Sequence, residues 1–229
     1  MTVNIDYYNL NFEKDIVLPK NNKEIKSKIF NLVNSLPCLN IVRNLKLLEE
    51  TISKTKEFSQ DKTTFMIFGT GGSNLGARAL VNILQGNESK KIIFYDNIDP
   101  INFKNYFKKI DLDNTGFIII SKSGSTPETL SQFTSIIELF DQKKTLNKFF
   151  KNTLVITEIK DSPLWNIAND NKCTIFKHEK DIGGRYSIFS NVGMVPAIIA
   201  GLDVKKIYSG ALDIISKKNY DDFLKLANY

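Results

Sequence analysis

Residues 116–130 read GFIIISKSGSTPETL: an apolar run, then a cluster of hydroxyls with a glycine, then Pro127 at the start of a helical pattern. This order is typical of a buried strand that is followed directly by a helix. Four further apolar runs lie on either side of it: 64–68 (TFMIF), 92–95 (IIFY), 153–157 (TLVIT) and 174–176 (TIF). Helical spacing over 74–84 and 127–140 separates some of them. The alternation predicts an α/β fold, a doubly wound parallel five-stranded sheet flanked by helices.

The segment before the sheet has a different pattern. Residues 1–60 contain two helical stretches, 23–36 and 39–57, which we expect to form an N-terminal helical segment packed on the flank of the sheet domain. The sheet domain itself is expected over residues 61–202, ending with a buried helix at 193–202.

Residues 203–229 predict an amphipathic helical tail without a strand. The last eight residues, DFLKLANY, stop in mid-pattern with no cap and no Gly or Pro stop. We interpret this tail as the helical start of a missing C-terminal domain, and the chain as an N-terminal fragment. A natural truncation is the alternative.

Composition is that of a soluble globular protein, with 42% hydrophobic and 24% charged residues. The N-terminus has acidic residues and no apolar h-region, and every apolar stretch is shorter than the roughly 20 residues of a membrane span. We therefore expect a cytoplasmic protein with no membrane partner. The net charge is +6, but the lysines alternate with acidic residues, which favours solvated helix faces over a nucleic-acid site.

Cysteine and histidine are scarce. Cys38 and Cys173 lie far apart and match no disulfide or zinc spacing, so we expect both to be reduced and buried. His178 is the only histidine, which argues against a site with several imidazoles and against a metal or cofactor of that kind. A lone histidine is usually a polar residue of the surface or of a loop.

The first motif is FGTGGSNLGARAL, residues 68–80, which follows a predicted strand and opens a helix. Small residues here let backbone N–H groups approach a ligand at a helix N-terminus. The motif lacks the GK[ST] of a phosphate-binding P-loop, and its glycine spacing is not GxGxxG. A tight strand-to-helix turn without a ligand explains this motif equally well.

The second motif is SKSGSTPETL, residues 121–130. Four hydroxyls, those of Ser121, Ser123, Ser125 and Thr126, precede a helix N-terminus and suit a phosphate group. The alternative is a simple helix cap. Because a cap needs only one hydroxyl, the density of hydroxyls favours phosphate.

The third motif is DIGGRYSIFSNVG, residues 181–193, in which two glycines precede Arg185. A guanidinium is always protonated and can hold a developing oxyanion. The alternative is a structural arginine paired with Asp181 or with a carbonyl.

Ligands of open parallel sheets bind beyond the carboxyl ends of the strands at the switch point, and the first two motifs lie at such ends.

Together, GTGGSNLG (69–76), SKSGSTPET (121–129) and GGRYS (183–187) resemble the phosphoglucose isomerase (glucose-6-phosphate isomerase) family within the sugar isomerase (SIS) domains. The first two motifs are shared with many phosphosugar-binding domains, whereas GGRYS is close to diagnostic of the isomerase. The resemblance implies a flavodoxin-like fold and an aldose–ketose isomerase of glycolysis and gluconeogenesis. Such an enzyme interconverts glucose 6-phosphate and fructose 6-phosphate without a cofactor, and we expect a homodimer when it is full length.

The resemblance also implies roles for individual residues. The phosphate of the hexose 6-phosphate is held by three hydroxyls and one backbone group, those of Ser121, Ser123, Thr126 and Lys122. Gly72 and Ser73 line the sugar side of the pocket.

For catalysis, the resemblance implies that Arg185 stabilises the enediolate and that Glu128 helps to orient a ring-opening histidine. The family's proton-transferring Glu, its ring-opening His and a late Lys follow the region that this chain covers. We therefore expect the 229-residue chain alone to be inactive. The alternative function is a stand-alone phosphosugar-binding SIS domain with a regulatory role.

Overall fold

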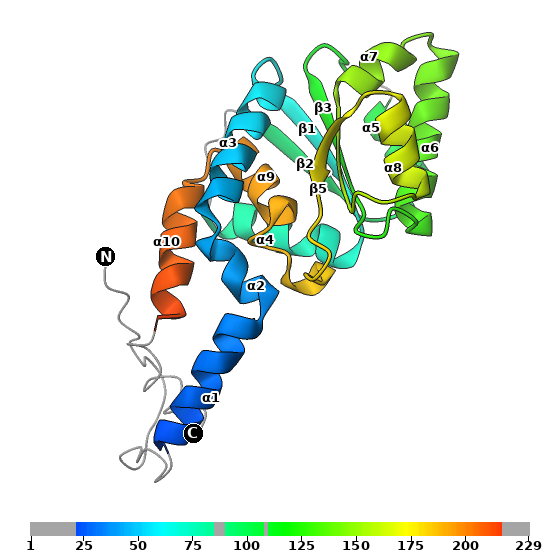
Figure 1. Ribbon diagram of the computed structural model, residues 1–229. Coiled ribbons are helices and arrows are strands. Elements are labelled where there is room, and N and C mark those ends of the chain that lie inside the picture. Colours follow the sequence, from blue (N-terminus) through cyan, green and yellow to red (C-terminus); the bar gives the residue numbers. More distant parts are fainter. Residues whose placement is uncertain (1–21, 85–89, 108–109, 217–229) are drawn as a thin grey trace. The chain divides into compact units, whose positions relative to one another are not determined.

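The computed structural model describes residues 22–84, 90–107 and 110–216 (Figure 1). Its centre is one sheet of five parallel strands in the order β2-β1-β3-β4-β5. The strands are β1 (Thr64–Phe68), β2 (Lys91–Tyr95), β3 (Thr115–Ile120), β4 (Thr153–Thr157) and β5 (Thr174–Lys177). This is the flavodoxin-like order of a doubly wound sheet, and it confirms the predicted fold class.

Alternate residues of the central strands enter two separate apolar clusters. Phe117 of β3 belongs to a cluster rich in phenylalanine, whereas its neighbour Ile118 belongs to a second cluster with Val195 and Ile199. Successive side chains of a strand point to opposite faces of the sheet. Both faces are therefore buried, which explains why β1, β3 and β4 are continuous apolar runs rather than alternating ones.

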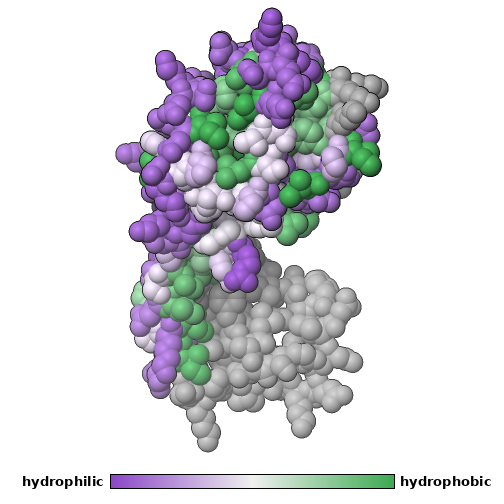
Figure 2. Space-filling model, turned by 90° about the vertical axis from the view of Figure 1, so that its right-hand side faces the viewer, coloured by the Kyte–Doolittle hydropathy of each residue, from purple (hydrophilic) through white to green (hydrophobic). Residues whose placement is uncertain are grey.

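Helices cover the two faces. The phenylalanine-rich cluster packs α5 (Pro100–Phe107), α6 (Pro127–Gln142), α7 (Leu146–Lys151) and α8 (Pro163–Asp170) against the sheet. The second cluster brings in α3 (Leu45–Ser59) and α9 (Asn191–Ile199), and α4 (Leu75–Leu84) packs on α9. On the side that carries α6 and α8 in Figure 1, hydrophilic side chains surround smaller hydrophobic areas (Figure 2).

Three of these helices, α5, α7 and α8, are absent from the sequence-based prediction. Each has only six to eight residues, too few for a clear helical period. Local signals define α8 instead: Pro163 begins it, and the Ser162 hydroxyl caps it by accepting a hydrogen bond from the Trp165 N–H.

Contacts divide the chain into two compact units, residues 46–204 and residues 1–45 with 205–229. The described part of the smaller unit contains α1 (Asn22–Ser35), α2 (Pro37–Asn40), the 3-10 turn η1 (Ile41–Arg43) and α10 (Val204–Ile214) from residue 205 onward. The expected domain boundaries near residues 60 and 202 stay a prediction. The expected tail after residue 216 lies outside the described residues.

The expected single helix over 39–57 is wrong. Asn44 has φ −86° and ψ 75°, outside the helical region, and its N–H closes η1 on the Ile41 carbonyl at 2.9 Å. The chain therefore restarts as α3 at Leu45. Asparagine is a poor helix former, so this break agrees with its intrinsic preference.

Both cysteines are free, but only Cys173 is buried, and Cys38 in α2 is partly exposed. The expectation of burial is thus wrong for Cys38. Burial raises the pKa of the Cys173 thiol to about 12. Among the described helices, none has both the length and the apolar character needed to cross a membrane.

Candidate functional site

The first two motifs meet at the carboxyl end of the sheet. β1 and β3 are neighbours, with Phe68 paired to Ile119; Gly69 of the first motif follows Phe68 directly, and Ser121 of the second motif follows the last β3 residue, Ile120. A methyl group placed on Gly69 would lie 3.2 Å from the Ile120 carbonyl oxygen. The strand order reverses at this pair, so the motifs lie at the topological switch point where α/β sheets bind ligands.

The hydroxyl-rich loop after β3 is tightly organised. The Ser121 side chain is buried, and its hydroxyl lies 2.8 Å from the Thr126 hydroxyl across the loop. Gly124 has φ +69°, and a methyl group there would lie 2.2 Å from the Ser162 hydroxyl oxygen. Position 124 therefore requires glycine, both for its backbone conformation and for space.

Thr126 precedes α6 but does not cap it with its side chain. Its hydroxyl pairs with Ser121 instead, which leaves the N–H groups of the first turn without that acceptor. Ser123 is exposed, and its hydroxyl oxygen accepts hydrogen bonds from the N–H and the hydroxyl of Ser125, both at 3.2 Å. The arrangement therefore differs from the simple cap that was the alternative, and it fits an anion site at a helix N-terminus.

The first and third motifs are in backbone contact. A methyl group on Gly72 would lie 2.2 Å from the Gly184 carbonyl carbon and 2.6 Å from the Arg185 nitrogen. Only a residue without a side chain allows two backbones to approach this closely. Ser73, half-buried, follows in the same 3-10 turn, η2 (Gly71–Ser73). The residues predicted for the sugar side thus lie against the segment that carries Arg185.

Arg185 lies in η3 (Gly184–Tyr186) and is exposed. Its guanidinium carbon is 5.6 Å from the centre of the Tyr186 ring, a cation–π distance. Within residues 22–84, 90–107 and 110–216, the Arg185 side chain has no hydrogen bond and no ion pair, so the alternative pairing with Asp181 is not present. A permanent cation is therefore available here to a ligand.

Glu128, the other predicted catalytic residue, lies in the first turn of α6 and is exposed. No described side chain contacts its carboxylate through a hydrogen bond or ion pair. The predicted role of Glu128 in orienting a ring-opening histidine therefore stays a prediction.

Lys122 contacts residues that follow two other strands, and the second motif did not predict these contacts. Its carbonyl accepts the Glu158 N–H at 3.1 Å, and its ammonium donates to the Lys180 carbonyl at 2.5 Å. The ammonium also lies 3.8 Å from the Glu158 carboxylate, which Lys160 approaches to 2.7 Å. The hydrogen bond from Lys160 lowers the pKa of Glu158, so this carboxylate stays ionised.

His178 is fully buried, so the expectation of a surface residue is wrong, although it lies in the loop directly after β5. It continues the β4–β5 ladder past Lys177, because its N–H donates to the Thr157 carbonyl at 2.7 Å. Nδ1 lies 3.1 Å from the Glu179 carbonyl, which assigns the ring proton to Nδ1, and Nε2 has no partner among the described residues. Burial lowers its pKa and favours the neutral ring.

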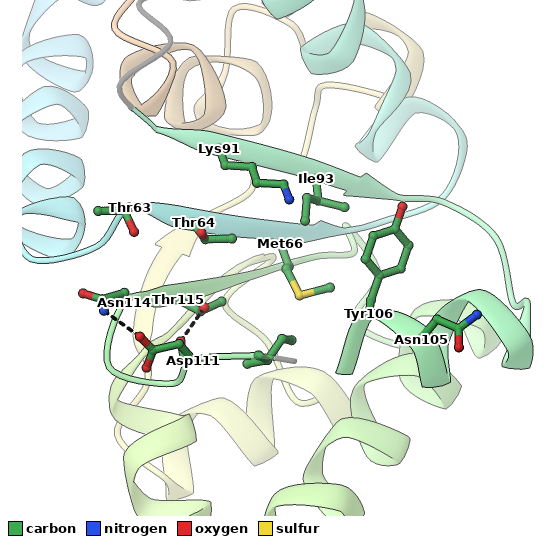
Figure 3. A pocket seen from close by; sticks show the side chains of 11 residues that line it. Thr63, Thr64, Met66, Lys91, Ile93, Asn105, Tyr106, Asp111, Asn114 and Thr115 are labelled. Carbon is green, nitrogen blue, oxygen red and sulfur yellow. Dashed lines mark hydrogen bonds between the residues drawn. The ribbon is translucent and has the colours of Figure 1, made fainter. Parts of the chain in front are cut away.

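A separate pocket lies at the opposite, amino ends of β1, β2 and β3, with Thr64, Lys91 and Thr115 in its lining (Figure 3). It has a volume of about 390 Å³ and contains no residue of the three motifs. The Asp111 carboxylate accepts a hydrogen bond from the Asn114 side chain, which lowers the Asp111 pKa and keeps a negative charge in the pocket. Because this pocket holds none of the motif residues, the carboxyl end of the sheet remains the candidate site.

Comparison with known proteins shows the family of the chain. The family model for phosphoglucose isomerase matches residues 21–219. The chain is 32% identical over 189 residues to the probable glucose-6-phosphate isomerase of Methanococcus maripaludis, covering 79% of this chain and 42% of the relative. It is 34% identical over 186 residues to the glucose-6-phosphate isomerase of Campylobacter jejuni, covering 79% and 43%. The fold and motifs define a phosphosugar isomerase domain, and the chain belongs to the phosphoglucose isomerase family.

The crystal structure of a glucose-6-phosphate isomerase from Chlamydia trachomatis has the same fold, with a TM-score of 0.68 at 19% identity over 87% of this chain and 46% of that one. The chain spans less than half the length of these relatives.

Proposed function

We propose that this chain supplies the phosphosugar-binding half of an aldose–ketose isomerase that interconverts glucose 6-phosphate and fructose 6-phosphate. The observation that carries the proposal is the backbone contact of Gly72 with Gly184 and Arg185, next to the hydroxyl loop on the neighbouring strand end. This contact and the pairing of β1 with β3 bring the hydroxyl loop and the Arg185 cation to one edge of the sheet. The names of the relatives, all glucose-6-phosphate isomerases, support the same reaction.

The phosphate is the part of the substrate that this chain holds. In the proposal, the hydroxyls of Ser121, Ser123 and Thr126 donate to its oxygens together with the Lys122 N–H, and the proton that joins Ser121 to Thr126 in the free chain turns to the phosphate. The positive end of the 16-residue helix α6 adds to the attraction. Neutral donors bind a dianion and still allow its release, which a reversible reaction needs.

The reaction moves a proton between C2 and C1 of the opened sugar, through an enediolate whose negative charge lies on oxygen. Arg185 stabilises that charge, because the guanidinium stays protonated at any working pH. It cannot act as the base for the same reason. In the proposal Glu128 orients a ring-opening histidine, and the proton-transferring base comes from a segment outside the 229 residues.

An isomerase assay tests the proposal. We expect interconversion of the two hexose phosphates by the longer native polypeptide that contains this chain, and no turnover by the 229-residue form. If the longer polypeptide binds hexose phosphates without isomerising them, the function is regulatory binding instead. Turnover by the 229-residue form would mean that Glu128, Glu158, Glu179 or His178 serves as the base. A homodimer and a cytoplasmic location of the full-length enzyme belong to the proposal, to be checked by sedimentation and fractionation.

A further inference from the structure

Lys122 reaches across the ends of three adjacent strands. Its backbone belongs to the loop after β3, and its carbonyl continues the ladder to β4 by accepting the Glu158 N–H. Its side chain then passes the end of β4 and donates to the carbonyl of Lys180, which follows β5. Neighbouring strands are about 4.8 Å apart, so only a long side chain can join β3 to the segment after β5.

The segment that Lys122 reaches is the one that carries Arg185. It runs from His178 to Ser187 and has internal hydrogen bonds from the Ile182 N–H to Glu179 and from the Tyr186 N–H to Gly183. Since no described residue holds the Arg185 side chain by a hydrogen bond or ion pair, and its ring contact is with Tyr186 of the same segment, the position of the guanidinium depends on this backbone. Gly72 supports the segment at Gly184, and Lys122 supports it at Lys180.

We propose that the Lys122 side chain is a positioning residue that couples the phosphate loop to the Arg185 segment. The inference rests on the proposed function, because it assigns phosphate to the Lys122 backbone. Phosphate that orders the loop through the Lys122 N–H would, through the same residue, fix the Lys180 carbonyl and the approach to Arg185. Binding of the remote, non-reacting phosphate would thereby help to align the group that stabilises the enediolate.

The environment of the ammonium favours this role over a direct contact with phosphate. One of its three protons is used by the Lys180 carbonyl, and the ionised Glu158 carboxylate lies 3.8 Å away on the same side. The side chain is 31% exposed, so it is held between two partners rather than extended into solvent. Lys160 has the same charge and the same Glu158 neighbour, but no described contact with Lys180, which makes it a matched control.

Hydrogen exchange of the full 229-residue chain tests the coupling, with inorganic phosphate as the probe. Without phosphate, Lys122→Met should speed exchange of the Ile182 and Tyr186 amides by about tenfold, because one charged hydrogen bond of a locally opening segment is lost. Lys160→Met should leave these amides unchanged, and Lys122→Arg should restore them. With phosphate, the wild type should gain protection in both 121–130 and 178–187, and Lys122→Met only in 121–130.

Two failures are distinguishable. Wild-type exchange at Ile182 and Tyr186 in the Lys122→Met variant, or an equal change in Lys160→Met, overturns the coupling. Absence of phosphate protection over 121–130 in the wild type overturns the proposed function instead. Lys122→Gln is measured in parallel, with the strand amides of β3 as the internal reference, in case the methionine variant unfolds globally.

In the longer polypeptide, Lys122→Met should lower kcat and leave KM for the sugar phosphate nearly unchanged. A rise in KM alone would indicate a direct phosphate contact and contradict positioning.

Discussion

The backbones of Gly72 and Gly184 are in direct contact, so that a methyl group on Gly72 would lie 2.2 Å from the carbonyl carbon and 2.4 Å from the carbonyl oxygen of Gly184. The two glycines are more than a hundred residues apart in the sequence and belong to different motifs. Their contact fixes the Arg185 segment against the turn after β1. Gly72 cannot be replaced without moving a backbone, whereas a methyl group on Gly184 would meet Gly72 at an ordinary 3.7 Å.

Gly72→Ala should destabilise the chain by about 1–3 kcal/mol, because the new methyl group overlaps backbone atoms that cannot rotate away. Urea unfolding measures the loss. The control is Gly76→Ala in α4, where the methyl group would meet Ile188 at an ordinary 3.6 Å. That variant should gain up to about 1 kcal/mol from the better helix propensity of alanine. Equal stability of the two variants would contradict the tight contact.

A double Ser123→Ala, Thr126→Ala change should weaken binding of a sugar phosphate by about 1–3 kcal/mol, the cost of lost hydrogen bonds to a charged group. The measurement is a thermal shift with 6-phosphogluconate. Thr134→Ala on the outer side of α6 is the control, since that hydroxyl is exposed and donates only to carbonyls of its own helix. Equal shifts in the wild type, the double variant and Thr134→Ala would contradict phosphate binding by this loop.

Arg185→Ala should leave stability unchanged within about 0.5 kcal/mol, because the exposed side chain contacts little besides the Tyr186 ring. In the longer polypeptide the same change should lower kcat about 100- to 1,000-fold, with a smaller effect on KM, because the charge it stabilises arises only during the reaction. Arg185→Lys should recover little activity, since an ammonium does not reproduce the planar guanidinium. A variant that unfolds, or that changes KM alone, would make Arg185 a structural or ground-state binding residue.

Buried His178 predicts a pH dependence of stability. Burial lowers its folded pKa below the ordinary 6.5, so the unfolded chain takes up a proton first as the pH falls. The stabilising contribution is complete above 6.5 and is lost as the pH falls through 6.5 toward the folded pKa, with a slope of at most about 1.4 kcal/mol per pH unit. Urea unfolding between pH 5 and 8 should show this slope in the wild type and a shallower one in His178→Gln. Parallel curves would contradict the neutral, buried ring.

The fold was predictable from the sequence because its signals are local. The runs 64–68 and 153–157 are strands with the predicted ends, and the other three strands differ by one residue at an end. Parallel strands buried on both faces leave continuous apolar runs that a sequence shows directly. The short helix α7 escaped prediction because LNKFFK has too few residues for a period.

The site was predictable only in its parts. The first two motifs identified strand ends, but the contact of Gly72 with Gly184 and the bond from Lys122 to Lys180 arise from strand order, which sequence spacing does not contain. The burial of His178 has the same origin, since its backbone pairs with β4. In a chain with one histidine, its position directly after an apolar strand was the signal that could have indicated burial.

The central claim is that a hexose phosphate binds at the carboxyl end of β1 and β3. A crystal structure of the chain with fructose 6-phosphate tests it most directly. We predict the phosphate within hydrogen-bond distance of the Ser121, Ser123 and Thr126 hydroxyls, with the sugar directed toward Gly72 and Arg185. A sugar phosphate found instead at the amino ends of the strands, in the pocket beside Lys91 and Asp111, would contradict the claim (Figure 3).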